Sequence, residues 1–193
     1  MRRGLATLIV VVVIVAVIAL AFLGTYNSLV SLDENVNSMW SQIDNQLQRR
    51  ADLIPNLVET VKGYAAHEES IFNEVTRARE KLITAQGVED KARAESELSG
   101  ALSRLLAIVE NYPNLKADAN FRQLADELAG TENRIAVARM DYNNAVQLYN
   151  SRIRRFPTVV IAGMFGFEKR DYFEAEEGAE QAPKVDFSTK ENN

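Results

Sequence analysis

The feature that most constrains this chain is an uninterrupted apolar run near its start, residues 5–23, with the sequence LATLIVVVVIVAVIALAFL. The run holds nineteen residues and contains no charged residue, proline or glycine. As a helix rising about 1.5 Å per residue it spans roughly 28 Å, close to the roughly 30 Å thickness of the hydrocarbon core of a bilayer. The run therefore predicts a transmembrane helix, with a short basic amino terminus at residues 1–4.

The charges on either side of the run predict its orientation. Arg2 and Arg3 precede it, whereas the first charged residues after it are Asp33 and Glu34. Positively charged residues close to a membrane span stay in the cytoplasm. The amino terminus is therefore expected to be cytoplasmic, and the rest of the chain extracytoplasmic.

A cleaved signal peptide is the alternative to an anchor, because Ala19-Leu20-Ala21 has the form of a cleavage site. The apolar run is longer than the usual apolar region of a signal peptide, about 7 to 15 residues. No polar segment separates the run from these alanines. An uncut anchor is therefore favoured.

The composition of the remaining residues narrows the classes of function. The chain has no cysteine, which excludes disulfides, thiolate catalysis, cysteine-ligated metals and lipid attached through cysteine. Only four prolines and nine glycines occur, which favours helix. The net charge is −5, and without the two arginines before the span it is −7. This acidic balance argues against nucleic acid as a ligand.

A seven-residue repeat of apolar or small residues follows the anchor and predicts long helices packed at a shallow angle. Pro55 lies within the repeat and is expected to kink the helix. Lys62-Gly63 followed by Glu68-Glu69 is typical of a helix end and a new start, which places a break at residues 63–67. One long helix over residues 27–86 stays an alternative. The repeat positions are Val36, Trp40, Ile43, Leu47, Ile54, Leu57, Val61, Tyr64, Ile71, Val75, Ala78 and Leu82, with Arg50 and Glu68 as exceptions.

Two more helices are predicted beyond Gly87, at residues 88–111 and about 116–156. Tyr112-Pro113 ends the first of them and Phe156-Pro157 the second, because a residue before proline is disfavoured in a helix. With helices at about 27–62 and 67–86, short connections make the default topology up-and-down. The sequence thus predicts an all-α fold: one amino-terminal transmembrane helix, then an antiparallel four-helix bundle of long helices over residues 26–166.

Two segments follow the last long helix. Residues 158–167, TVVIAGMFGF, are apolar but too short to span a bilayer. They are expected to fold against the end of the bundle, and docking at the membrane surface is the alternative. Residues 167–193 are rich in acids and lack periodicity, which predicts a disordered acidic tail.

Polar residues set into the last helix are the main candidates for an interaction site. Tyr142-Asn143 and Tyr149-Asn150 are one heptad apart, so the rings would be buried while their polar ends seek partners. Such a polar layer fixes how helices align, and a site for a ligand or a partner chain is the alternative. Glu132 and Arg139 are candidate partners within the same helix.

Three arginines, Arg152, Arg154 and Arg155, end the same helix, which the predicted topology returns toward the membrane. They would complement the negative end of the helix dipole, or they would contact anionic lipid headgroups.

The sequence offers no constellation for catalysis, a cofactor or a metal. The single histidine is His67, beside a predicted turn, and the residue three before it is Tyr64 rather than a carboxylate. The glycines are scattered, so no phosphate-binding loop is formed. The chain is therefore not expected to be an enzyme, and no catalytic, cofactor-binding or metal-binding residue is predicted.

The sequence resembles the LemA family over nearly its whole length. The resemblance is carried by YNSLVSLDENVNSMWSQIDNQLQRRADLIPNLVETVKGYAAHE at residues 26–68, YPNLKADANFRQLADELAGTENRIAVARMDYNNAVQLYNSRIRRFP at residues 112–157, AGMFGF at residues 162–167 and PKVDF at residues 183–187. It implies a single amino-terminal anchor, a four-helix bundle and a bacterial envelope protein with no recognised enzymatic activity. One relative is linked to formation of an intracellular membrane compartment, and relatives are often encoded near a membrane zinc protease.

These observations predict a single-pass protein of the bacterial inner (cytoplasmic) membrane that acts as a non-enzymatic, self-associating scaffold in membrane organisation. Anchoring raises the effective concentration of the helical domain, so weak contacts can build a homo-oligomer. The alternative is an adaptor or regulator of a membrane protease or another envelope complex, and an uncharacterised enzyme is the remote one.

Overall fold

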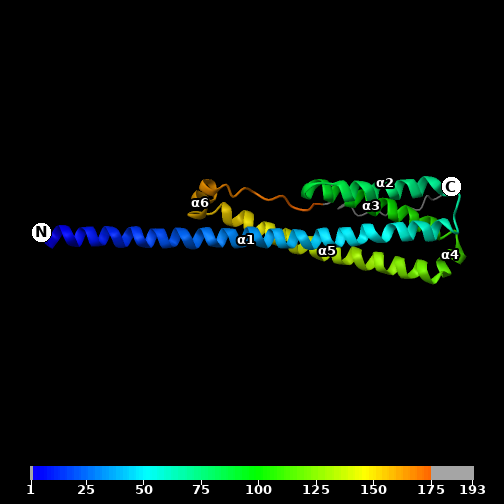
Figure 1. Cartoon of the computed structure of the whole chain (residues 1–193), viewed down its shortest axis with the longest axis horizontal. Helices are drawn as coiled ribbons and strands as arrows, with labels where there is room; N and C mark the ends of the chain where they lie inside the picture. Colours follow the sequence, from blue (N-terminus) through cyan, green and yellow to red (C-terminus); the bar gives the residue numbers. More distant parts are fainter. Residues whose placement is uncertain (1, 175–193) are drawn as a thin grey trace, which may run out of the picture.

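The computed structural model describes residues 2–174, and this part of the chain is all-helical without strands, as the sequence predicts (Figure 1). Four of its helices are long and two are short. They are α1 (Arg2–Lys62), α2 (Glu69–Thr84), α3 (Gly87–Val109), α4 (Pro113–Ala117), α5 (Ala119–Ile153) and α6 (Thr158–Phe165).

Helix α1 is a single helix of 61 residues that joins the apolar run to the folded body without a break. Its apolar side chains from Leu8 to Leu23 are mostly exposed, and Leu29 is the first fully buried one. The amino-terminal part therefore projects beyond the rest of the molecule (Figure 1). The helix also continues through Pro55, whose side chain is exposed.

Two antiparallel pairs form the body. Helix α5 packs along α1, and α2 and α3 pack as a hairpin whose first helix also contacts α1 (Figure 1). Helix α1 ends at Lys62 and α2 starts at Glu69, so residues 27–86 form two helices.

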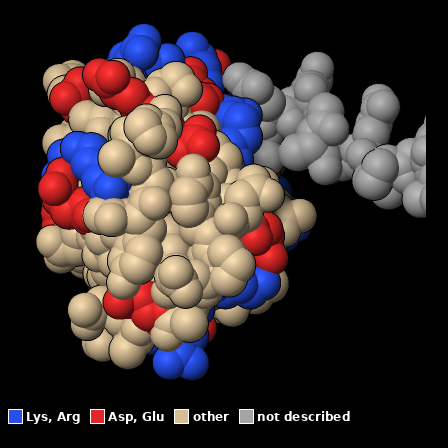
Figure 2. Space-filling model, turned by 90° about the vertical axis from the view of Figure 1, so that its right-hand side faces the viewer, with Lys and Arg blue, Asp and Glu red and all other residues tan. Residues whose placement is uncertain are grey.

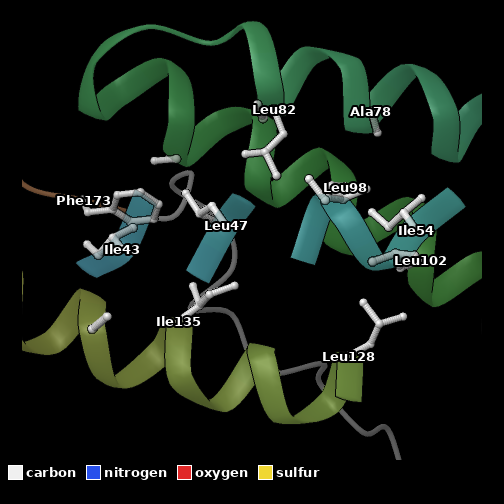
Figure 3. Close-up of a cluster of buried hydrophobic side chains, with 14 of the residues drawn as sticks. Ile43, Leu47, Ile54, Ala78, Leu82, Leu98, Leu102, Leu128, Ile135 and Phe173 are labelled. Atoms are coloured by element: carbon white, nitrogen blue, oxygen red, sulfur yellow. The ribbon is translucent and has the colours of Figure 1, made fainter. Parts of the chain in front are cut away.

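The core lies where these four helices meet, and its side chains come from every one of them (Figure 3). Burying one leucine contributes roughly 1.5–3 kcal/mol, so this part is stabilised mainly by the hydrophobic effect. Its central members include Leu47, Ile54, Leu82, Leu98, Leu102, Leu128 and Ile135.

Local sequence signals explain the two sharpest helix boundaries. Gly87 has a φ of 77°, a conformation that favours glycine, and it makes the turn between α2 and α3. Asp118 caps α5 by accepting hydrogen bonds from the backbone N–H groups of Asn120 and Phe121, at 2.9 and 3.0 Å. The bond from Phe121 is the main reason that the pKa of Asp118 lies below its usual value.

The body divides into two halves along α1. Lys91, near the start of α3, pairs with Asp44 at 2.9 Å and marks the level at which α2 and α3 begin to cover α1. We call the four-helix part beyond this level the distal half. We call the part before it, where α1 residues 29–43 pack against the end of α5, the anchor-side half. In the anchor-side half, α6 and an extended segment also pack against α1 and α5 (Figure 1).

The extended segment, residues 168–174, is here called the strap, and it corrects the predicted start of the disordered tail. The strap runs from the end of α6 along α1 and α5 toward the turn between α2 and α3 (Figure 1). Its Phe173 is 1% exposed and lies near Ile43 and Leu47 (Figure 3). Acidic composition suggested disorder, but these residues are held by side chains of α5. Residues 175–193 lie outside the described residues.

Candidate functional site

Two asparagines of α5 hold the strap by its backbone. The side-chain amide of Asn150 donates to the carbonyl of Arg170 at 2.8 Å, and its oxygen accepts from the N–H of Arg170 at 2.9 Å. Asn143 makes the same pair of bonds with Phe173, at 3.1 and 2.9 Å. Each asparagine therefore satisfies one full peptide position of a segment that has no neighbouring strand.

The spacing of the asparagines matches the spacing of the strap residues. Asn143 and Asn150 are seven residues apart, about 10.5 Å along a helix. Arg170 and Phe173 are three residues apart, roughly 10 Å along an extended chain. Two asparagines one heptad apart on a helix therefore match the residue spacing of an antiparallel extended peptide.

The two tyrosines of the same motif are buried beneath the strap. The hydroxyl of Tyr142 donates to the carbonyl of Asp171 at 2.8 Å, and the ring lies 5.7 Å from that of Trp40. Burial raises the pKa of Tyr142 to about 12. Burial also raises the pKa of Tyr149, and Asp33 adds to this effect. Both phenols therefore stay neutral at physiological pH, and the hydroxyl of Tyr142 acts as a donor.

Two strap side chains add sequence-specific anchors to the backbone contacts. The guanidinium of Arg170 donates to the carboxylate of Asp33 on α1, at 3.0 and 2.8 Å. The ring of Phe173 lies 6.2 Å from that of Trp40, and the guanidinium of Arg139 lies over it at 5.1 Å. The groove between α1 and α5 therefore accommodates an extended segment with arginine and phenylalanine three residues apart.

The structure separates Glu132 from the other candidate residues of α5. Its carboxylate pairs with Arg50 of α1 at 2.5 Å, in the distal half. Arg50 also donates to Glu95 of α3 at 2.8 Å, and Ser99 donates to the same Glu95 oxygen at 2.8 Å. Tyr142, Asn143, Tyr149 and Asn150 thus form one site with Arg139 at its edge, and Glu132 belongs to another.

The cluster around Arg50 was not identified as a site from the sequence, although the signal was present. Arg50 is an exception to the heptad repeat, and it lies in the core with 5% of its surface exposed. Glu95 is equally buried and ties α3 to it. A charged residue at a repeat position therefore marked a buried ion pair between α1 and α3, and the exposed Glu132 of α5 pairs with the same arginine.

The three arginines at the end of α5 lie at the anchor end of the body. Arg152, Arg154 and Arg155 are all exposed, and Arg152 lies in the last turn of α5. Helix α6 follows directly. It packs against α1 and α5 with Thr158, Ile161 and Ala162 buried, as expected of a segment folded against the end of the bundle.

Aromatic contacts fix the level of α6 along α1. The ring of Phe165 lies 6.0 Å from that of Phe22 and 4.8 Å from that of Tyr26. Gly166, with a φ of 73°, ends α6, and Phe167 then turns back so that its ring lies 5.8 Å from that of Tyr26. Helix α6 is therefore level with the end of the apolar run.

The remaining features bear on ligands and surface charge. Within residues 2–174, no group of three or more histidines and carboxylates is placed to hold a metal ion, and His67 is exposed between α1 and α2. Figure 2 shows the distal end of the molecule, where acidic and basic side chains are interspersed rather than separated by sign.

Comparison with known proteins places the chain in a family. A model described as the LemA family matches residues 39–187, which include the asparagines of α5 and the strap. The chain belongs to the LemA family. The resemblance seen in the sequence blocks is therefore confirmed.

Magnetosome proteins and a protein LemA are among the individual relatives of this LemA family member. It is 28% identical over 200 residues to the magnetosome proteins MamQ 1 and MamQ 2 of Paramagnetospirillum magneticum, covering 89% of this chain and 74% of each of theirs. It is 26% identical over 175 residues to protein LemA of Metamycoplasma hominis, covering 88% of this chain and 76% of that one. In the described part of the chain, one helix, α1, is long and apolar enough to cross a membrane.

Proposed function

We propose that this protein is a membrane-anchored, non-enzymatic scaffold of the bacterial envelope that self-associates and takes part in membrane organisation. The observation that carries the proposal is the continuity of α1 from the apolar run into the core. A continuous helix makes the span and the body one unit, whereas a flexible linker would leave the body free to reorient.

The rest of the proposal follows from the arrangement of the helices. The body is an up-and-down four-helix bundle whose anchor-side half is completed by the strap and α6. The span lies in the inner membrane, with the amino terminus in the cytoplasm and the bundle outside it. The similarity to the magnetosome proteins MamQ 1 and MamQ 2 supports a role in organising a membrane.

Self-association is tested with the full chain reconstituted in vesicles over a range of protein densities. The chain has no cysteine, so Val137→Cys alone carries donor or acceptor dyes on an exposed site of α5. We expect energy transfer that exceeds the value for randomly distributed monomers and that decreases when unlabelled protein is added. Transfer equal to the random value at every density would exclude self-association under these conditions.

A second candidate function, an adaptor for a membrane protease or another envelope protein, is favoured by the groove between α1 and α5 that holds the strap. The groove recognises an extended peptide through its backbone, which is how many partners are bound. Photocrosslinkers at exposed positions beside the strap would identify such a partner in intact cells. We expect a chain lacking residues 168–193, whose groove no longer holds the strap, to bind more of the partner, and one lacking residues 175–193 to bind as much as the full chain. Crosslinks to copies of the chain alone would contradict an adaptor function.

A further inference from the structure

Helix α6 carries an exposed apolar face that its packing leaves uncovered. Thr158, Ile161 and Ala162 point into the body, whereas the other large side chains of the helix face outward. Single exposed apolar residues are common on protein surfaces, but a contiguous group marks a contact site. The exposed fractions are 84% for Phe156, 44% for Val159, 52% for Val160, 66% for Met164 and 52% for Phe165.

The position of this face indicates what covers it. Phe165 contacts Phe22, which is within the apolar run, and Tyr26, one turn beyond it. The surface of the run is itself exposed, with Leu20 at 69% and Leu23 at 57%. The outer face of α6 is thus continuous with the surface that lipid would surround if α1 spans a bilayer.

The surrounding residues have the chemistry of a membrane interface. Tyr26 lies where the apolar run ends, the level at which aromatic residues are enriched in membrane proteins. Arg154 and Arg155 are exposed immediately before α6 and add positive charge next to its apolar face. An apolar face beside basic residues is the pattern of a helix that lies in the interface plane.

We propose that the outer face of α6, formed by Val159, Val160, Met164 and Phe165, inserts into the headgroup boundary of the bilayer that α1 spans, together with Phe156 just before the helix. This second contact would fix the tilt and rotation of the body against the membrane. The inference rests on the proposed anchoring of α1. Arg154 and Arg155 face the phosphates of the lipid in this arrangement.

Single-cysteine variants of the full chain test this inference directly, because the native chain has no cysteine to remove. Met164→Cys is labelled with an environment-sensitive fluorophore and the protein is placed in nanodiscs of phosphatidylcholine and phosphatidylglycerol. Val137→Cys is the matched control, because Val137 is 55% exposed on α5 in the distal half. Val13→Cys reports whether the span itself lies in lipid.

We expect the probe at residue 164 to emit at shorter wavelength than the probe at 137. Lipids carrying a nitroxide near the headgroup should quench the probe at 164 several-fold more than the control. Equal quenching at 164 and 137, with the probe at 13 quenched by deep nitroxides, would overturn the inference and leave the anchor intact. An unquenched probe at 13 would overturn the anchor as well. A blue-shifted probe at 164 that lipid nitroxides do not quench, and that reverts on dilution, would assign the face to a second copy instead.

Discussion

The distal and anchor-side halves of the body are closed by different kinds of contact. In the distal half, four helices share a core in which Leu98 and Leu105 are fully buried. In the anchor-side half, α2 and α3 are absent and the strap covers α1 and α5. The strap has no helix face to pack, so Asn143 and Asn150 hold its backbone instead. Where two helices of a bundle extend beyond the other two, their side-chain amides can bind an extended segment in place of the missing helices.

The largest effect is expected from breaking the buried Arg50–Glu95 ion pair, which joins α1 and α3 in the distal half. Arg50→Ala leaves the carboxylate of Glu95 buried without its partner, which typically costs about 3–5 kcal/mol. Urea unfolding of the full chain in nanodiscs, followed by circular dichroism, measures the loss. Arg49→Ala is the control, since the Arg49 side chain is 58% exposed, and it should change the free energy of unfolding little.

The same pair offers a sharper version of this test. Replacing both partners, as Arg50→Met with Glu95→Leu, removes the buried charges together. We expect this double variant to recover most of the stability that Arg50→Ala loses. A double variant as unstable as the single one would show that the pair contributes through packing rather than through an unpaired charge.

A cavity in the distal core should have the next largest effect. Leu98 is fully buried, so Leu98→Ala is expected to lower the free energy of unfolding by about 2–5 kcal/mol. Leu106→Ala is the matched control, because Leu106 lies on the same helix but is 40% exposed. It should lower the free energy of unfolding much less. Equal losses at both positions would contradict the arrangement of α3 described above.

Releasing the strap should affect only the anchor-side half. Asn143→Ala with Asn150→Ala removes four hydrogen bonds, each with a net contribution of about 1 kcal/mol, and we expect the strap to detach. Trp40, the single tryptophan, lies against Phe173 and its emission should shift to longer wavelength. The exposed Asn144→Ala serves as control. Amide exchange in α2 and α3, away from the turn at Gly87 that the strap approaches, should stay unchanged, and faster exchange there would contradict two separately closed halves.

The smallest effect is expected from alkaline pH. The pKa of Tyr142 is raised to about 12 by burial, so the folded state keeps its proton at a pH where a free tyrosine, with a pKa near 10, has lost it. The stability that depends on neutral Tyr142 is present below about pH 10 and is lost as the pH rises toward 12. Trp40 fluorescence follows this loss of stability as the pH is raised. The loss should be smaller in Tyr142→Phe, and a pH profile equal to that of the native chain would show that other groups cause it.

Much of the architecture could be predicted because it follows from periodicity. The apolar run and the seven-residue repeats through Ile43 and Tyr142 lie in helices, and Gly87 lies at the turn between α2 and α3. The side chains of Tyr142, Asn143, Tyr149 and Asn150 were predicted to seek polar partners. Partners within the bundle were expected, with Glu132 and Arg139 as candidates, and the structure gives the strap.

Periodicity could not predict contacts between segments that are far apart in the chain. The strap has no repeat of its own, since it is fixed by α5 through its backbone and by Asp33, 137 positions away from Arg170. Arg50 broke the repeat, but its partners on α3 and α5 become evident only when three helices are brought together. Sequence patterns locate elements, and the partners of polar side chains depend on their assembly.

The proposed function depends on α1 joining the apolar run and the bundle into one rigid unit. The most direct test is the distribution of distances between nitroxides at Val15→Cys and Leu148→Cys, both exposed positions, in the full chain in nanodiscs. We expect one narrow distribution that broadens when four glycines are inserted between Gly24 and Thr25. A distribution that is already broad in the chain without the insertion would contradict a rigid connection through α1.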